Sequence, residues 1–327
     1  MGERTRGRKV VLPGGSGHLG QLLTEHFTAR GDEVVVLGRG AGSVTGARHV
    51  RWDGRTVEDI WAREVDGADL VVNLAGRSVD CRYDKTNLAE MYGSRVESTR
   101  AVGRAIAGAD RPPPTWLQMS TATVYAHTFG PPHDEDRHTL GGHEEGVPTY
   151  WRGSVHIAEA WEQALNGADT PDTRRVALRT SMVMAPTPGG AFRTLERLAR
   201  LGLGGAVAGG RMFMSWIHAR DFVRAIDHLA STHALDGPVN LAAPEPLEQR
   251  DFMAAVRRAQ STLRVPLALP ATRWMTAIGS WALRTDPELV LKSRRVVSRR
   301  LAESGFEFEY PSWGPAAADL VRAVEAR

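Results

Sequence analysis

Cysteine, lysine and long hydrophobic runs are scarce in this 327-residue chain, and each scarcity excludes something. Cys81 is the only cysteine, which excludes a disulfide within the chain and favours a reducing compartment, so we expect a cytoplasmic protein. No uninterrupted apolar stretch reaches the length of a bilayer span, so we expect no membrane partner. Residues 1–9 are polar and basic, unlike a secretory signal.

An excess of charge of one sign is also absent. The chain has 41 lysines and arginines against 38 acidic residues, and the basic ones are spread out apart from a short run near Arg294 and Arg299. A nucleic-acid-binding protein would cluster them, so we expect no nucleic-acid partner. The hydrophobic content of 42% is ordinary for a globular protein, and the length suits one large domain or two of ordinary size.

Strand and helix patterns alternate through the N-terminal half of the chain. Short apolar and β-branched runs predict strands over residues 9–12, 33–37, 69–74, 115–121 and 174–179. Apolar residues at helical spacing predict helices over residues 18–29, 88–106 and 151–165. Such alternation is typical of parallel sheets covered by helices on both faces. The predicted fold class is therefore α/β, with a Rossmann-type doubly wound parallel sheet.

The pattern becomes less regular after Pro186, where glycine and proline are frequent. Three further helices are predicted, over residues 247–260, 274–283 and 287–303. We therefore expect a smaller, mainly helical C-terminal domain that binds substrate or covers it. The Rossmann domain is expected to span 8–185, with 215–242 returning to it as a helix (218–230) and a strand (239–241), and the smaller domain to span 186–214 and 243–327.

The first strand is joined to the first helix by a turn with the spacing Gly-x-x-Gly-x-x-Gly. Between a strand and a helix, such glycines permit a sharp turn, let the backbone approach a pyrophosphate and let the helix pack closely. The amides at the helix start then face the dianion, although a tight turn without a ligand is the alternative. A P-loop lacks its lysine here, and a nucleophile elbow lacks its second glycine. The residues predicted to hold a dinucleotide are Gly14, Ser16, Gly17, His18, Leu19 and Gly20.

The end of the second strand bears on the choice between NAD(H) and NADP(H). Proteins that use NAD(H) usually carry Asp or Glu here, about 20 residues after the glycines, to hold the ribose hydroxyls. Gly38 stands at that position, and Arg39 follows with a guanidinium that suits the 2′-phosphate of NADP(H). An exposed loop arginine is the alternative, and Arg48 could assist. We expect the cofactor to be NADP(H).

The predicted strand over 69–74 runs into small residues. Ala75 and Gly76 let the backbone pass beside a cofactor, although an ordinary strand-to-loop turn is the alternative. Asn73, Ala75 and Gly76 therefore complete the predicted cofactor-binding set.

Several segments, taken in order, resemble those of the extended short-chain dehydrogenases/reductases. They are Gly14–Gly20, Asn73–Gly76, Met119–Tyr125 and Ser215–His218 with Asp221. Further segments resemble an atypical subgroup, the "epimerase family proteins", which carry a C-terminal domain of unknown function. They are Arg179–Thr180, Pro188–Ala191, Gly237–Asn240, Ala243–Pro244 and Arg299–Pro311. The resemblance implies a Rossmann domain with NADP(H) bound across it, and a smaller domain that covers the nicotinamide and holds a small-molecule substrate.

The chemistry that the resemblance implies is incomplete in this chain. Active members use a Ser or Thr hydroxyl to polarise the substrate and a Tyr-x-x-x-Lys pair to exchange a proton. The resemblance gives these roles to Thr121, for which an ordinary strand threonine is the alternative, and to Tyr150. Ser154 stands where the lysine should be, and no lysine occurs between Lys85 and Lys292.

A second alignment, anchored on Trp161 and Glu162, moves the tyrosine position to Gly153 or Ser154 and also leaves the triad incomplete. Arg152 or His156 could replace the missing cation, but a helix-surface role suits both better. A tyrosine without a neighbouring cation is a poor base at neutral pH.

Two further segments limit the substrate. The histidines of residues 127–143 match no metal-ligand spacing, so no metal is expected. Sugar-nucleotide enzymes of the family often carry a diphosphate-binding arginine near Met214, but here Arg211 lies three residues earlier and the neighbouring Met212, Phe213 and Trp216 are apolar. This favours a less charged substrate, although core packing around Trp216 is the alternative. The sequence thus supports two hypotheses: an NADP(H)-dependent oxidoreductase or epimerase acting on a small carbonyl or hydroxyl compound, and a non-catalytic NADP(H)-binding sensor or partner-binding protein. It does not indicate the oligomeric state.

Overall fold

A computed structural model describes residues 7–40, 44–260, 269–270 and 286–326. Its centre is a parallel sheet of seven strands in the order β10-β6-β5-β4-β1-β2-β3. The strands are β1 (Lys9–Pro13), β2 (Glu33–Gly38), β3 (Arg48–Arg51), β4 (Leu70–Asn73), β5 (Thr115–Thr121), β6 (Arg174–Thr180) and β10 (Gly237–Leu241). The strand order reverses between β1 and β4, and ligands of doubly wound sheets bind at the carboxyl ends beside such a reversal. The predicted fold class is confirmed.

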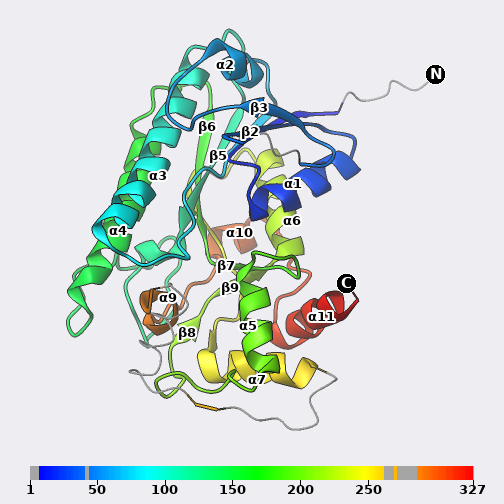
Figure 1. Ribbon diagram of the computed structural model, residues 1–327. Coiled ribbons are helices and arrows are strands. Elements are labelled where there is room, and N and C mark those ends of the chain that lie inside the picture. Colours follow the sequence, from blue (N-terminus) through cyan, green and yellow to red (C-terminus); the bar gives the residue numbers. More distant parts are fainter. Residues whose placement is uncertain (1–6, 41–43, 261–268, 271–285, 327) are drawn as a thin grey trace.

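Helices cover both faces of the sheet (Figure 1). One layer holds α1 (His18–Ala29) and α6 (Ala219–Ser231), and the other holds α2 (Asp59–Val65), α3 (Lys85–Ala107) and α4 (Arg152–Asn166). A strand between the two layers buries apolar side chains on both sides, as β1 does: Val10 and Leu12 pack into one core, while Val11 packs into the other. This explains why the strands appear in the sequence as continuous apolar runs rather than as alternating patterns.

The C-terminal part is mainly helical, as the sequence predicts. It contains α5 (Ala191–Arg200), α7 (Gln249–Ala259) and α11 (Trp313–Glu325), with two small ladders, β8 (Phe213–Met214) on β11 (Leu247–Glu248) and β7 (Met182–Met184) on β9 (Trp216–His218). Its core forms around Trp313, whose ring stacks on Phe252 at 3.8 Å and meets Trp216 edge-on at 4.8 Å. Within the described ranges, no helix combines the length and hydropathy needed to cross a bilayer.

Several predicted elements need correction. The sequence did not indicate β3, α2 or α11, and the first two are short and rich in polar residues. Residues 287–303 form two short helices, α9 (Glu288–Leu291) and α10 (Arg299–Glu303), rather than one. The predicted helix over 274–283 lies outside the described residues.

An extended stretch, residues 292–298, separates α9 from α10 and lies along the loop that follows β5. His133 N donates to Arg295 O at 2.8 Å, and Val297 N donates to His133 O at 3.0 Å. Ser293 Oγ donates to Thr128 O at 2.6 Å. These bonds satisfy the backbone of a segment that would otherwise be helical, which explains why helical periodicity failed here. We refer to residues 292–298 as the crossing segment.

Candidate functional site

The glycine turn packs directly on the end of β4. Gly14 has φ +77°, and a Cβ atom there would lie 2.6 Å from Ala75 Cα, so any side chain would push the turn away. A Cβ atom on Gly20 would lie 2.1 Å from Gly15 O, so only glycine lets α1 sit against the turn. The glycine spacing is thus required by the fold itself.

The same turn presents amides that suit an anion. Ser16 and Gly17 are exposed, and α1 begins after Gly17 without a side-chain cap. The first backbone bond of the helix is Gln21 N to Gly17 O, so the amides of residues 18–20 have no partner within the helix. Leu19 packs its side chain on the core, which leaves only its backbone to face a ligand. Exposed, uncapped amides fit a pyrophosphate.

His18 links this turn to the loop after β7. Its Nδ1 lies 3.2 Å from Thr187 Oγ1, and a Cβ atom on Gly190 would lie 2.8 Å from its Nε2. Burial lowers the pKa of His18, which favours the neutral ring at pH 7. The loop of residues 187–190 therefore rests on the helix start at the predicted pyrophosphate site.

A side chain at the end of β2 would have to displace two neighbouring side chains. A Cβ atom on Gly38 would lie 2.9 Å from His49 Nε2 and 3.3 Å from Ser16 Oγ. Arg39 is exposed and has no ion-pair partner in the described part of the chain. Glycine thus stands, closely packed, where proteins that use NAD(H) carry an acid.

Arg48, which by sequence could assist but is not positioned by any motif, is already paired with acidic side chains. Its Nη2 lies 2.7 Å from Glu64 Oε2 and 3.1 Å from Glu33 Oε1. The hydrogen bond from Arg48 is the largest cause that lowers the pKa of Glu64, so both side chains are charged and already paired. Arg48 therefore joins the start of β3 to α2 and to β2 through ion pairs.

A hollow of about 440 Å³ lies beside Gly38 and was not predicted, because β3 and α2 were not predicted. It is lined by Arg51, Trp52, Asp53, Glu58 and Ile60. Trp52 N donates to Gly38 O at 3.0 Å, which joins this hollow to the end of β2.

Asn73 fixes the end of β4. It is fully buried, its Nδ2 donates to Gln118 Oε1 at 2.9 Å, and its Oδ1 accepts from Ala75 N at 3.1 Å. Gly76 follows as an exposed residue. The side chain of Asn73 is thus occupied in holding the strand end, while Ala75 and Gly76 form the adjoining backbone.

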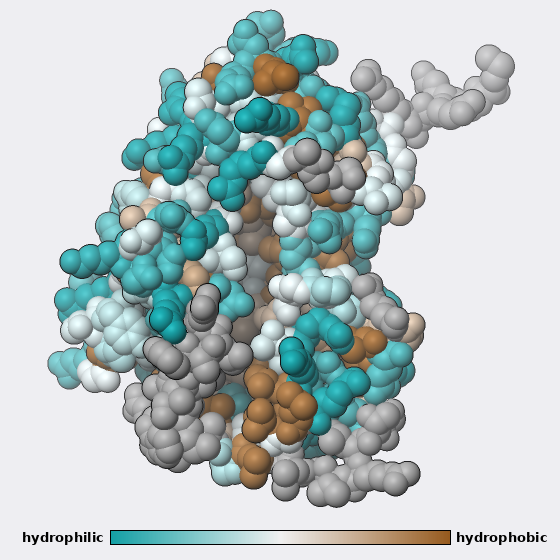
Figure 2. All heavy atoms as spheres, in the orientation of Figure 1, coloured by the Kyte–Doolittle hydropathy of each residue, from teal (hydrophilic) through white to brown (hydrophobic). Residues whose placement is uncertain are grey.

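Thr121 ends β5 at the carboxyl edge of the sheet. Its hydroxyl lies 3.1 Å from Thr123 Oγ1 and accepts from Thr123 N at 3.2 Å, which caps the short helix η1 (Ala122–Val124). Tyr150 lies in η2 (Thr149–Trp151) before α4 and is 47% exposed. Figure 2 shows the molecule hollowed between the layer of α3 and α4 and the side of α1 and α5, with hydrophobic residues along the hollow.

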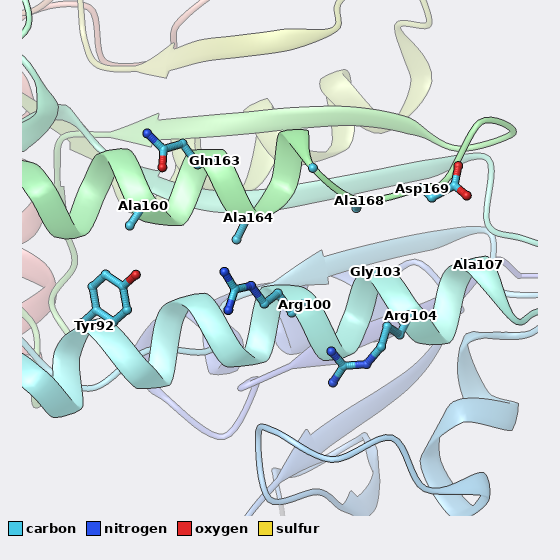
Figure 3. Close-up of a pocket in the computed structure, with 11 residues that line it drawn as sticks. Tyr92, Arg100, Gly103, Arg104, Ala107, Ala160, Gln163, Ala164, Ala168 and Asp169 are labelled. Atoms are coloured by element: carbon cyan, nitrogen blue, oxygen red, sulfur yellow. The ribbon is translucent and has the colours of Figure 1, made fainter.

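Neither suggested replacement for the lysine is buried in the site. Arg152 and His156 are exposed, and the His156 ring stacks on Tyr92 of α3 at 5.8 Å. Tyr92 lines a pocket of about 370 Å³ together with Arg100 and Arg104, and Arg100 extends between α3 and α4 (Figure 3). The glycine turn and Thr121 do not line that pocket.

A buried polar network behind Thr121 escaped sequence reasoning. Glu162 of α4 accepts from Arg179 Nε at 2.9 Å and Nη2 at 2.8 Å, and from Ser120 Oγ at 2.6 Å. Arg179 Nη1 also donates to Tyr125 OH at 3.0 Å, and that hydroxyl donates to Asn240 Oδ1 at 2.7 Å. Burial alone would lower the pKa of Arg179, but Glu162 holds it raised. The sequence named these residues only as parts of family segments or as an alignment anchor, and gave no sign that they meet.

Known proteins resemble the chain along nearly its whole length. The model of the NAD dependent epimerase/dehydratase family matches residues 10–242, and a domain of unknown function, DUF1731, matches residues 281–320. The human epimerase family protein SDR39U1 is 28% identical over 318 residues, which cover 96% of this chain and 99% of that protein. The Bacillus subtilis epimerase family protein YfhF is 27% identical, over 92% of this chain and 94% of its own.

Solved structures agree with these matches. The crystal structure of human SDR39U1 (isoform 2) with NADPH superposes with a TM-score of 0.81 at 27% identity, over 96% of this chain and 99% of that one. MoeE5 in complex with UDP-glucose and NAD shares the fold, with a TM-score of 0.74 at 17% identity over 97% and 99% of the two chains. With a family model that matches most of its length and the uncapped glycine turn of a dinucleotide-binding sheet, the chain belongs to the NAD dependent epimerase/dehydratase family.

Proposed function

We propose that this protein is an NADP(H)-dependent oxidoreductase or epimerase that acts on a small carbonyl or hydroxyl compound. The observation that carries the proposal is that two features lie at the same edge of one parallel sheet. The amides of residues 18–20, which have no partner within α1, follow β1, and the Thr121 hydroxyl ends β5. A dinucleotide bound along that edge would extend from the first feature toward the second.

The preference for NADP(H) is supported by Gly38 and Arg39. An acidic side chain at position 38 would have to displace His49, while the exposed guanidinium of Arg39 is available to a 2′-phosphate. NADPH in the human SDR39U1 crystal also supports this preference. The hollow lined by Trp52 and Asp53 beside Gly38 would take the adenosine end.

The proposed chemistry divides between two side chains. A bound nicotinamide would supply or accept the hydride. Thr121 would donate a hydrogen bond to the substrate oxygen and polarise it, while Tyr150 would exchange the one proton with that oxygen. Both Thr121 and Tyr150 are at least partly accessible.

Replacing Arg39 by Ala tests the cofactor choice. Hydrogen bonds to charged groups contribute about 1.5–3 kcal/mol, so we expect the Kd for NADPH to rise roughly 10- to 100-fold while that for NADH changes little. Titration of NADPH fluorescence measures both. Arg258→Ala, which removes an exposed arginine of α7, is the matched control. Equal losses of NADPH and NADH affinity in Arg39→Ala would contradict the assignment.

Activity is tested by NADPH consumption with a panel of small aldehydes and ketones. We expect Thr121→Ala and Tyr150→Phe each to lower kcat by at least about tenfold, since each removes a proton donor. If both variants keep full turnover, these two residues are not the catalytic pair.

The second candidate function is a non-catalytic NADP(H)-binding sensor. It is favoured by Ser154, which stands four residues after Tyr150 and donates to Glu288 Oε1 at 2.6 Å instead of offering a cation. Saturable NADPH binding without turnover on any carbonyl would support this reading.

A further inference from the structure

Lys292 is the only one of the three lysines that is buried, and it belongs to the C-terminal domain. It is the first residue of the crossing segment, with its side chain 1% exposed. Its Nζ donates to Thr123 O at 3.0 Å, across 169 positions of sequence. Lys85, by contrast, is exposed at the start of α3, and Lys9 pairs with Glu64 at the far end of β1.

Lys292 is accompanied by a buried carboxylate one helical turn earlier. Glu288 Oε1 lies 3.7 Å from Lys292 Nζ and accepts from Ser154 Oγ at 2.6 Å. Glu288 is completely buried, and its Oε2 has no hydrogen-bond partner in the part of the chain that the structure describes. Two residues of the C-terminal domain thus reach both η1, through Thr123, and α4, through Ser154.

The charged groups around Lys292 and Glu288 act on the pKa values of these two residues in opposite directions. Burial, followed by the nearby Arg294, lowers the pKa of Lys292 to about 8, while Glu288 and Glu144 act in the other direction. Burial raises the pKa of Glu288, against Arg294 and Lys292, and Asp286 raises it further. Burial raises the pKa of Tyr83, and the negative charge of Glu288 raises it further. A small change of local charge can therefore shift a proton within this group.

We propose that Lys292 is a positioning residue of the proposed site. With Glu288 it holds Thr123 O and Ser154 Oγ in place, and so fixes the Thr121 hydroxyl relative to the start of α4. This inference rests on the proposed function, because it assumes a nicotinamide near Thr121.

A buried ammonium with a single short hydrogen bond and a carboxylate at 3.7 Å is costly to keep, and a methionine of similar length would pack there at less expense in desolvation. Such groups concentrate where a protein uses their charge. Here the charge acts on the backbone of η1, whose amide at Thr123 donates to the Thr121 hydroxyl.

The pKa of Lys292 should respond to the oxidation state of a bound nicotinamide. Oxidised nicotinamide carries a positive charge that the reduced ring lacks. If the ring lies near Thr121, the ammonium form of Lys292 is less favourable beside NADP⁺ than beside NADPH. The pKa of Lys292 should therefore be lower with NADP⁺, by at least about half a pH unit for a unit charge acting through protein.

The test uses the full chain labelled with ¹³C at lysine Cε. Three lysines give three resonances, and Lys292→Arg identifies the one of interest. We expect that resonance to titrate near pH 8, and with NADP⁺ below its value with NADPH. Lys9 and Lys85 should not respond. Glu288→Gln removes a charge that raises the pKa of Lys292, so it should lower that pKa further.

Titration of NADPH fluorescence distinguishes a failure of the proposed function from a failure of the present inference. If NADPH does not bind, the proposed function fails. If it binds but the Lys292 resonance is the same with NADP⁺ and NADPH, the present inference fails alone. For function, Lys292→Met should change the emission of bound NADPH and lower any carbonyl-reducing kcat at least about fivefold, and Lys292→Arg should restore part of both. Lys85→Met, at an exposed lysine, is the matched control. Bound-NADPH emission that Lys292→Met leaves unchanged also overturns the inference.

Discussion

Replacing Glu162 by Gln removes the charge at the centre of the network behind Thr121. The side chain keeps its shape, but its amide nitrogen meets Arg179, which has only donors to offer. Breaking a buried pair by removing one partner costs about 3–5 kcal/mol, because the other charge stays buried without compensation. Glu162 is 13% and Arg179 8% exposed at the side chain, so we expect a loss near the lower end, about 3 kcal/mol.

Urea unfolding followed by tryptophan fluorescence measures this loss as a shift of the midpoint at constant slope. Glu159→Gln is the control, since Glu159 lies on the same helix, is half-buried and forms no ion pair in the described part of the chain. Adding Arg179→Met to Glu162→Gln should cost less than the sum of the two single changes, because both act on one pair. A loss below about 1 kcal/mol for Glu162→Gln would refute the reasoning, since it would mean that the pair is solvated.

Three further outcomes are expected. Gly14→Ala should weaken NADPH binding at least about tenfold in fluorescence titration while the chain still folds cooperatively, since Gly14 has φ +77° and an added Cβ atom would lie 2.6 Å from Ala75 Cα. Unchanged affinity would contradict the turn's role. Asp227 is partly buried, which opposes ionisation, but His26 and Arg8 hold its pKa well below the usual range. Its contribution to stability is therefore present above about pH 4 and lost on acidification, and Asp227→Asn should flatten the acid limb of a stability–pH curve. Arg48→Ala should lower the unfolding midpoint but leave the Kd for NADPH unchanged.

Local patterns sufficed wherever the structure depends on neighbours in sequence. Short apolar runs located β1, β2, β5 and β6 to within a residue or two, because a strand covered by helices on both faces buries apolar side chains on both. Helical periodicity wrongly predicted a helix through residues 292–298, where the backbone instead forms hydrogen bonds to the loop after β5. Sequence patterns also missed β3, whose four residues Arg-His-Val-Arg carry too few apolar positions to be recognised.

In the candidate site too, the sequence identified some features, while others are known only from the structure. By sequence, Arg39 directly follows the position of the usual acid, while nothing positions Arg48. The structure adds that Arg48 is paired with Glu64 and Glu33, whereas Arg39 has no ion-pair partner in the described part of the chain. The roles of Thr121 and Tyr150 stay predictions, for which the structure provides positions and partners.

By itself the sequence determined the glycine turn, the parallel sheet and the family resemblance, because each is written in the spacing of nearby residues. Only the tertiary structure decided which distant groups meet. The contact between Lys292 and Thr123 spans 169 positions, and the one between Ser154 and Glu288 spans 134. No periodicity encodes such pairs, since they depend on how the sheet and the C-terminal domain dock. A polar residue in an apolar context signals that a partner exists, but only the fold identifies it.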